Sequence, residues 1–217
     1  MVVAKLLHQP SLSFPPELLL LAQGTAGGMR AAIFDVDGVL TDGSLYIGEQ
    51  GEIFKAFSVL DGQGLKLLVA AGIVPIVITG RDSPAVRQRV ADLGLPHAVF
   101  GAKDKLLVAQ AKLLELGLVW PDVAVIGDDW PDLPLLLRAG FSAAPPNAHA
   151  EVRAVVDHVT ALGGGRGAAW NFAICSWWRA GVTAPCFVSK PAPSMRAEPG
   201  LMVLSNPDQT GGRRHVG

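Results

Sequence analysis

Short apolar runs alternate with stretches of helical periodicity from Met29 to Thr160, and this alternation constrains the fold more than any other feature of the sequence. The first run, Ala31 to Val36, is almost continuously apolar, which predicts a strand that is buried on both faces. Strands that alternate with helices are typical of right-handed βαβ units around a parallel sheet. The sequence therefore predicts an α/β fold with a doubly wound, Rossmann-like parallel sheet.

The other strands and helices follow the same periodicities. Strands are expected over Val74 to Thr79, Ala98 to Phe100 and Val123 to Gly127, and weaker ones over Phe141 to Ala143 and His158 to Thr160. Helices are expected over Gly64 to Ala71, Pro84 to Leu93, Asp104 to Leu116, Leu133 to Ala139 and Ala148 to Val155. Ser44 to Ile47 and Glu52 to Phe57, joined through Gly48 to Gly51, predict a β-hairpin directly after the first strand.

Composition narrows the functional classes. The 217 residues are 50% hydrophobic, which is enough for one well-buried domain. A formal net charge of −1 gives no global attraction to nucleic acid or to a membrane surface, so neither is expected as a partner. Cys175 and Cys186 lack metal-ligand spacing, and Leu18 to Leu21 is too short to span a membrane and predicts a helical turn. A soluble cytoplasmic protein with a discrete local site is expected.

Polar residues follow each predicted strand at the edge where such sheets bind ligands. They are Asp35 and Asp37 after the first strand, Thr79 after the second, Lys105 at a helix start and Asp128 after Gly127. Carboxylates suit Mg²⁺ far better than zinc, and a lysine can hold phosphoryl oxygens. Each feature has a simpler explanation by itself: Asp35 to Gly38 and Thr79-Gly80 could be ordinary turns, and Lys103 competes with Lys105.

Together, in this order, the four motifs resemble those of the haloacid-dehalogenase-like phosphohydrolases. They are Asp35 to Asp42, Ile78 to Arg81, Lys103 to Lys105 and Gly127 to Asp132. The resemblance implies that Asp35 attacks phosphorus to form an aspartyl-phosphate, and that Asp37 protonates the leaving oxygen and then activates water. It also implies that Mg²⁺ binds the side chains of Asp35 and Asp128 and the backbone carbonyl of Asp37. Thr79 and Lys105 would bind the phosphoryl oxygens, whereas Asp129 and Asp132 are expected in supporting positions.

No cap domain fits between Asp37 and Thr79 or between Thr79 and Lys105, because the expected elements use up both intervals. Within the capless members, the resemblance is to the family of 3-deoxy-D-manno-octulosonate 8-phosphate phosphatases. It is carried by Asp35 to Gly43, Lys55 to Gly64, Ile78 to Arg81 and Gly163 to Ala168. The resemblance implies a homotetramer in which hairpins associate and a glycine-rich tail covers a neighbouring site. It also implies release of the sugar acid used for lipopolysaccharide.

The implied substrate carries a phosphate and a carboxylate, so cationic and backbone donors should surround it. By resemblance, the substrate-binding residues are Asp37, Ser58, Val59, Leu60, Asp61, Gly62, Lys66, Gly80, Arg81, Arg89 and Lys105, some across a subunit boundary. Many relatives carry arginine where this chain has Leu60 and Lys66, and a lost guanidinium alters anion recognition. Arg89 could equally be a solvated helix charge.

The resemblance stops after Ala168. Residues 1–28 are expected to form an N-terminal extension with a short helix, residues 29–168 the phosphatase domain and residues 169–217 an atypical tail. The tail clusters Trp170, Trp177 and Trp178 and then becomes rich in Gly and Pro. Read in a shifted frame, Ala169 to Thr183 can encode a helix like that of relatives, which indicates a frameshift and predicts poor packing beyond Ala168. A divergent, disordered extension is the alternative, and an intact mass would separate the two.

Rival functions use similar residues. A phospho-receiver domain also arranges acids, a threonine and a lysine around Mg²⁺, but it places the acceptor aspartate after the third strand. A phosphatase for another sugar phosphate, such as a sialic acid 9-phosphate, would share the whole catalytic set. A catalytically weak tetrameric binding module is the third alternative.

Overall fold

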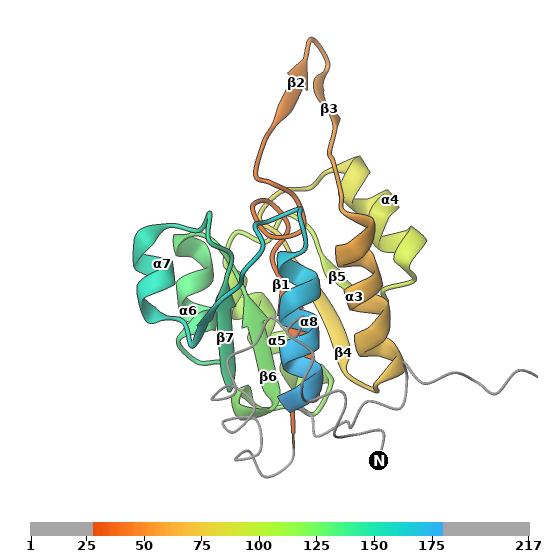
Figure 1. Ribbon diagram of the computed structural model, residues 1–217. Coiled ribbons are helices and arrows are strands. Elements are labelled where there is room, and N and C mark those ends of the chain that lie inside the picture. Colours follow the sequence, from red (N-terminus) through yellow and green to blue (C-terminus); the bar gives the residue numbers. More distant parts are fainter. Residues whose placement is uncertain (1–27, 180–217) are drawn as a thin grey trace, which may run out of the picture. The chain divides into compact units, whose positions relative to one another are not determined.

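A six-stranded sheet forms the centre of the computed structural model, which describes residues 28–179 (Figure 1). Its strands are β1 (Ala31–Phe34), β4 (Val74–Ile78), β5 (His97–Val99), β6 (Val123–Ile126), β7 (Phe141–Ala144) and β8 (His158–Val159). Every neighbouring pair in the sheet is parallel. The predicted doubly wound α/β fold is confirmed.

Helices lie between and after these strands, and each except α8, which was not predicted, begins or ends close to its predicted position. They are α3 (Val59–Ala70), α4 (Pro84–Leu93), α5 (Lys105–Glu115), α6 (Leu133–Leu136), α7 (Ala150–Val155) and α8 (Ala168–Arg179), with short 3₁₀ turns η1 (Trp120–Asp122) and η2 (Trp130–Asp132). Ser83 caps α4 by accepting a hydrogen bond from the Val86 N–H, and Gly94 ends it in the left-handed conformation. Local capping signals therefore set these boundaries correctly.

The predicted start of α3 at Gly64 was wrong. The helix begins at Val59, because the Ser58 side chain accepts a hydrogen bond from the Asp61 N–H and acts as the N-cap. Gly62 and Gly64 are both buried inside the helix. The Ser58 cap outweighs the low helix propensity of these glycines.

Strand order places β1 in the middle of the sheet, as β5-β4-β1-β6-β7-β8. Phe34, the last residue of β1, is in register with Val77 of β4 and Ile126 of β6. The chain first adds strands on one side of β1 and then crosses to the other, so the winding reverses between β1 and β6. Ligands bind at such a switch point in doubly wound sheets. The residues that follow β1 and β6 are therefore brought together by topology.

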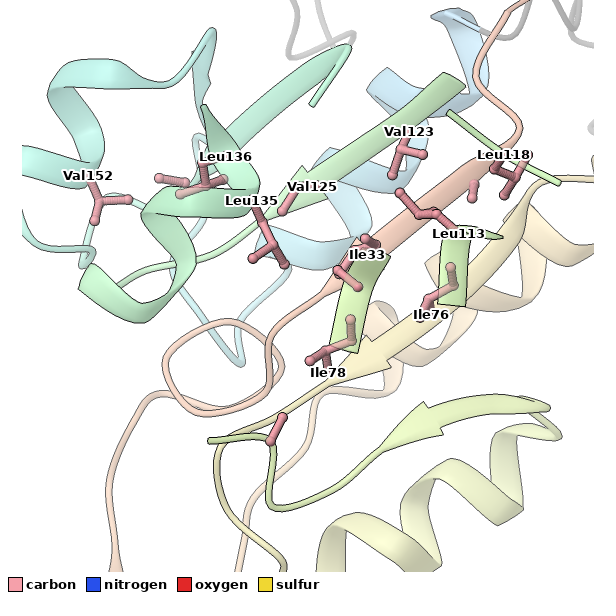
Figure 2. Packing of buried hydrophobic residues seen from close by; sticks show 14 of the residues in the cluster. Ile33, Ile76, Ile78, Leu113, Leu118, Val123, Val125, Leu135, Leu136 and Val152 are labelled. Carbon is pink, nitrogen blue, oxygen red and sulfur yellow. The ribbon is translucent and has the colours of Figure 1, made fainter. Parts of the chain in front are cut away.

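Alternate residues of the central strands face two separate cores. Ile33 and Val125 point toward α5 and α6, where they pack with Leu113 and Leu135 (Figure 2). On the opposite face, Phe34 meets the ring of Phe172 edge-on at 5.2 Å between ring centroids. Apolar residues on both sides of each strand explain why the strands read as continuous apolar runs.

Helix α8 provides Phe172 and corrects the expectation for the first part of the tail. Poor packing beyond Ala168 is wrong for residues 169–176, because Ala169, Phe172 and Ala173 are buried and α8 lies against α3 and β1. Residues 169–176 lack a clean helical pattern, but packing of their apolar side chains against the sheet stabilises the helix. The tail from residue 180 onward and the N-terminal extension with its expected helix lie outside the described residues.

The β-hairpin is confirmed as β2 (Tyr46–Gly48) and β3 (Gly51–Phe54), and it projects beyond the end of the sheet (Figure 1). Between β1 and β4 the chain holds only this hairpin and α3, and between β4 and α5 only α4 and β5. Neither insertion point carries a cap domain. Among residues 28–179, none of the helices is long and apolar enough to cross a membrane.

Candidate active site

Asp35 and Lys105 form the centre of the site. Asp35 directly follows β1 and is 7% exposed, and Lys105 is the first residue of α5. The Lys105 ammonium donates a hydrogen bond of 2.6 Å to Asp35 Oδ1. Burial alone would lower the pKa of Lys105, but Asp35 and Asp132 outweigh burial and raise it, so the side chain is cationic. A cation is thus fixed beside a buried carboxylate at the switch point of the sheet.

Asp132 is the second partner of Lys105, at 2.7 Å from Oδ1. Its Oδ2 accepts hydrogen bonds from the N–H groups of Asp128 and Asp129, and the residue is 2% exposed. Both oxygens are therefore occupied, which makes Asp132 an anchor for Lys105 and for the loop after β6. This agrees with its expected supporting position. Asp129 caps Trp130 and faces solvent, also in agreement.

Asp128 stands beside Asp35 with an unsatisfied atom. Its Oδ1 is buried and has no hydrogen-bond partner among the described residues. Carboxylate oxygens of Asp35, Asp128 and Asp132 lie within 4.8 Å of one another. Burial and then the neighbouring carboxylates raise the pKa of Asp128 to about 8, and burial and Asp132 raise that of Asp35 to about 6 despite Lys105.

This donor set fits a hard divalent cation. Crowded carboxylates with raised pKa values are favoured in their ionised forms by a positive charge, and an unpaired buried oxygen can serve as a ligand to it. Asp35 and Asp128 offer such oxygens, whereas those of Asp132 are already used. The side chain of Asp37 lies outside the group.

Asp37 makes different contacts, two residues after Asp35. Its Oδ1 accepts a short hydrogen bond from Lys55, and its Oδ2 lies 3.8 Å from Arg81 Nε. Lys55 also pairs with Glu52 at 3.2 Å. The sequence prediction missed Lys55 and Glu52. The only available signal was two charged residues on a hairpin strand that otherwise reads as apolar.

Thr79 and Gly80 follow β4 as expected. Thr79 is 1% exposed and its Oγ1 accepts a hydrogen bond from the Arg81 N–H at 3.3 Å, so it shapes the turn that carries Arg81. Gly80 is exposed, and a Cβ there would lie no closer than 3.7 Å to the Ala102 carbonyl oxygen. Gly80 therefore leaves open space at this edge of the sheet.

A glycine-rich segment locks the turn after Asp35 in place. The Gly165 N–H donates to the Val39 carbonyl at 2.9 Å, and Asn147 bridges the Gly38 carbonyl and the Gly164 N–H. A Cβ at Gly164 would lie 1.8 Å from the Gly38 oxygen, so only glycine allows this approach. The loop before α8 thus supports the turn after Asp35 within the same chain.

The structure gives other partners to much of the predicted substrate-binding set. Asp61 is 2% exposed, and its carboxylate accepts hydrogen bonds from the N–H groups of Gly167 and Trp170, at the start of α8. Arg89 donates to the Ser58 carbonyl at 3.0 Å. These groups hold α3, α4 and α8 together, and they do not contact Asp35 or Lys105.

Three further members of that set are exposed. Val59 is 86% exposed, Leu60 is 41% exposed and Lys66 is exposed on α3 without an ion pair in the described part of the chain. Gly62 is buried, and a Cβ there would lie 2.3 Å from Arg89 Nη2. The exposed members are free to meet another molecule beside α3.

Comparisons with known proteins agree with this geometry. The 3-deoxy-D-manno-octulosonate 8-phosphate phosphatase of Escherichia coli K12 is 41% identical over 143 residues, which cover 66% of this chain and 76% of that protein. The chain belongs to the 3-deoxy-D-manno-octulosonate 8-phosphate phosphatase family. The resemblance drawn from the four motifs is therefore confirmed, and a receiver domain is excluded. No family model matches the chain.

Solved structures of this phosphatase family share the fold. The Yersinia pestis enzyme aligns with a TM-score of 0.71 at 35% identity, covering 76% of this chain and 87% of that one. The Moraxella catarrhalis enzyme aligns with a TM-score of 0.67 at 37% identity, covering 75% and 90%. That structure is a complex with a magnesium ion, a phosphate ion and a KDO molecule.

Proposed function

We propose that this protein is a magnesium-dependent phosphatase that hydrolyses 3-deoxy-D-manno-octulosonate 8-phosphate to the free sugar acid and phosphate. The observation that carries the proposal is the buried Asp35–Lys105 pair with the unpaired Asp128 oxygen beside it. Family membership supports the substrate, which is the one named for the relatives. The proposal includes a cytoplasmic location.

Asp35 is the proposed nucleophile. Its carboxylate oxygen attacks phosphorus, the bond from phosphorus to the sugar oxygen breaks, and an aspartyl-phosphate forms. Lys105, held by Asp35 and Asp132, lies where it can neutralise charge on the transferring phosphoryl group. Thr79 and the Gly80 N–H extend the same edge of the sheet and would bind further phosphoryl oxygens.

Asp37 is the proposed acid and base. It gives a proton to the leaving sugar oxygen in the first step, and it takes a proton from water when the aspartyl-phosphate is hydrolysed. The carboxylate contacts neither Lys105 nor Asp128, which leaves it free to act on the leaving group rather than on phosphorus. Arg81 lies beside it and would bind an anionic part of the substrate.

A magnesium ion held by the Asp35 and Asp128 side chains, and by the Asp37 backbone carbonyl, would supply positive charge against the repulsion between carboxylate and phosphate. Asp128 supports this assignment, because its buried Oδ1 lacks any other partner in residues 28–179. The raised pKa values of Asp35 and Asp128 support it as well, since a cation would favour both ionised forms.

A homotetramer is part of the proposal. The hairpin exposes apolar side chains that no other described element covers: Leu45, Tyr46, Ile47, Ile53 and Phe54. Exposed apolar surface of this kind is typical of association sites. Ser58, Leu60, Lys66 and Arg89 would then contribute to recognition at a boundary between subunits, which explains why they lie apart from Asp35.

Phosphate release from a panel of sugar phosphates tests the function. We expect activity on the octulosonate 8-phosphate only with Mg²⁺, and none from Asp35→Asn. Asp92→Asn is the matched control and should keep full activity. Asp92 is an exposed residue of α4, and its carboxylate accepts a hydrogen bond from the Gln88 side chain. Hydrolysis of the phosphate ester by Asp35→Asn would contradict the assignment of Asp35 as the nucleophile. Preference for a sialic acid 9-phosphate or a hexose phosphate would overturn the substrate and leave the family intact.

A further inference from the structure

Lys55 is a buried cation that the phosphoryl-binding site does not use. It directly follows β3, and its side chain is 1% exposed. The ammonium contacts Asp37 Oδ1 and Glu52 Oε2, both carboxylate oxygens. Burying an ammonium is costly, and a buried ion pair adds little net stability compared with apolar packing. Stability alone therefore gives a poor reason for a lysine at this position.

The contacts of Lys55 join the base of the hairpin to the site. Glu52, on β3, also accepts a short hydrogen bond from the Ser83 hydroxyl and lies 3.7 Å from Arg81 Nη2. Arg81 in turn lies 3.8 Å from Asp37 Oδ2. Charged groups from the hairpin, from the turn after β1 and from the turn after β4 thus meet around one carboxylate, that of Asp37.

The two oxygens of Asp37 are not equivalent in this arrangement. Oδ1 accepts a hydrogen bond from the buried Lys55, whereas among residues 28–179 the charged neighbour of Oδ2 is the more distant Arg81, whose side chain is 47% exposed. A carboxylate held at one oxygen cannot rotate freely, so its second oxygen points in a fixed direction. Proton transfer depends on such positioning, because the acid must lie within hydrogen-bond reach of the leaving oxygen.

We propose that Lys55 is a positioning residue for the acid and base: it holds Asp37 through Oδ1 and leaves Oδ2 to exchange the proton. The inference rests on the proposed function of Asp37. In the first step the Oδ2–H bond breaks and an O–H bond forms on the sugar oxygen, as the bond from that oxygen to phosphorus breaks. Lys55 itself touches no substrate, because its side chain is enclosed.

Dependence on the leaving group tests this role. A sugar alkoxide needs a proton as it departs, whereas nitrophenolate leaves well without one. The quantity to measure is kcat/KM for the octulosonate 8-phosphate and for p-nitrophenyl phosphate, because kcat/KM reports the steps up to release of the alcohol. General acid catalysis is worth about 10²–10⁴-fold. Lys55→Met should therefore lose at least about tenfold more activity on the sugar phosphate than on the nitrophenyl ester.

Matched controls make the result specific. Lys112→Met removes a lysine that pairs with Glu115 at 2.7 Å on α5, and it should leave both substrates unaffected. Glu52→Gln keeps the shape of its side chain but weakens its attraction for Lys55. It should therefore also lose more kcat/KM on the sugar phosphate than on the nitrophenyl ester, but by a smaller factor than Lys55→Met. Because this second variant is milder, it decides the matter if Lys55→Met does not fold.

Equal losses on both substrates would show a structural role for Lys55, and unchanged values would show none; either result overturns the proposal. A rise in KM alone on the sugar phosphate would make Lys55 a binding residue and also overturn it. Failure of the proposed function looks different: the wild-type protein would then release no phosphate from either substrate, or Asp35→Asn would remain active.

Discussion

Lys105 Nζ lies 2.6 Å from Asp35 Oδ1, although the two residues are separated by 70 positions in the sequence. Replacing Lys105 with Met should lower kcat by at least about a hundredfold, because charge on the transferring phosphoryl group would lose its fixed cation. Steady-state assays on the preferred phosphate ester measure the effect. Lys103→Met is the control, since Lys103 is exposed two residues earlier and should be dispensable. Comparable losses from both variants would contradict the assignment of Lys105.

The raised pKa values of Asp35 and Asp128 predict how the stability of the metal-free protein depends on pH. An acid whose pKa is higher in the folded state binds more protons there than in the unfolded state, so it favours folding at low pH. This contribution is complete below the unfolded pKa near 3.8 and is lost as pH rises through about 6 for Asp35 and about 8 for Asp128.

Chemical denaturation between pH 5 and pH 9 in the presence of a chelator should therefore show a falling free energy of unfolding. Mg²⁺ should bind more tightly as pH rises through the same range, because the ligands must be ionised. Asp128→Asn should flatten the metal-free curve. A metal-free stability that rises from pH 6 to pH 9 would contradict the shifts.

Asp61 is predicted to act on stability rather than on substrate binding. Its carboxylate accepts hydrogen bonds from Gly167 and Trp170 at the start of α8. Asp61→Asn should cost about 1–2 kcal/mol of unfolding free energy, because an amide can accept with only one of its two ends. Asp92→Asn, on the surface of α4, should cost almost nothing. An unchanged stability with a raised KM would return Asp61 to the substrate-binding set.

The exposed hairpin predicts the state of association. Ile53 is 66% exposed on β3, and Ile53→Lys should break the proposed tetramer into smaller species because a charge would be buried at each contact. Leu114→Lys on α5 is the matched control, since Leu114 is 83% exposed and lies away from the hairpin. Sedimentation velocity measures both. A monomeric wild-type protein, or a tetrameric Ile53→Lys, would exclude association through the hairpin.

Two buried serines should respond to alanine in opposite directions. Ser176 in α8 is fully buried, and its hydroxyl has no partner among the described residues, so Ser176→Ala should stabilise the protein by about 1 kcal/mol. Ser142 is also buried, but its hydroxyl donates to Asp157 at 2.9 Å, so Ser142→Ala should destabilise it. Thermal unfolding of both variants checks the pair. Destabilisation by Ser176→Ala would indicate a hydrogen bond that the described residues do not provide.

Periodicity and motif order were enough to predict the fold class, the hairpin and the places of Asp35, Thr79, Lys105 and Asp128. These are local properties: an apolar run specifies a buried strand, and in a parallel sheet the residue after each strand must lie at the same edge. Boundaries were less accurate where a cap competed with propensity, as at Ser58 before α3. The packing of α8 was mispredicted because its burial depends on the sheet face that receives it.

The sequence by itself determined that Asp35, Asp37, Lys105 and Asp128 would lie at the same edge of the sheet, since strand ends and chain order already imply it. Only the tertiary structure decided how these residues are paired. Asp35 pairs with Lys105, and Asp37 pairs with Lys55 at the base of the hairpin. Asp61 instead accepts a hydrogen bond from the Trp170 N–H in α8. Pairing of charges depends on distances between segments that are far apart in the chain, and no local pattern encodes those distances.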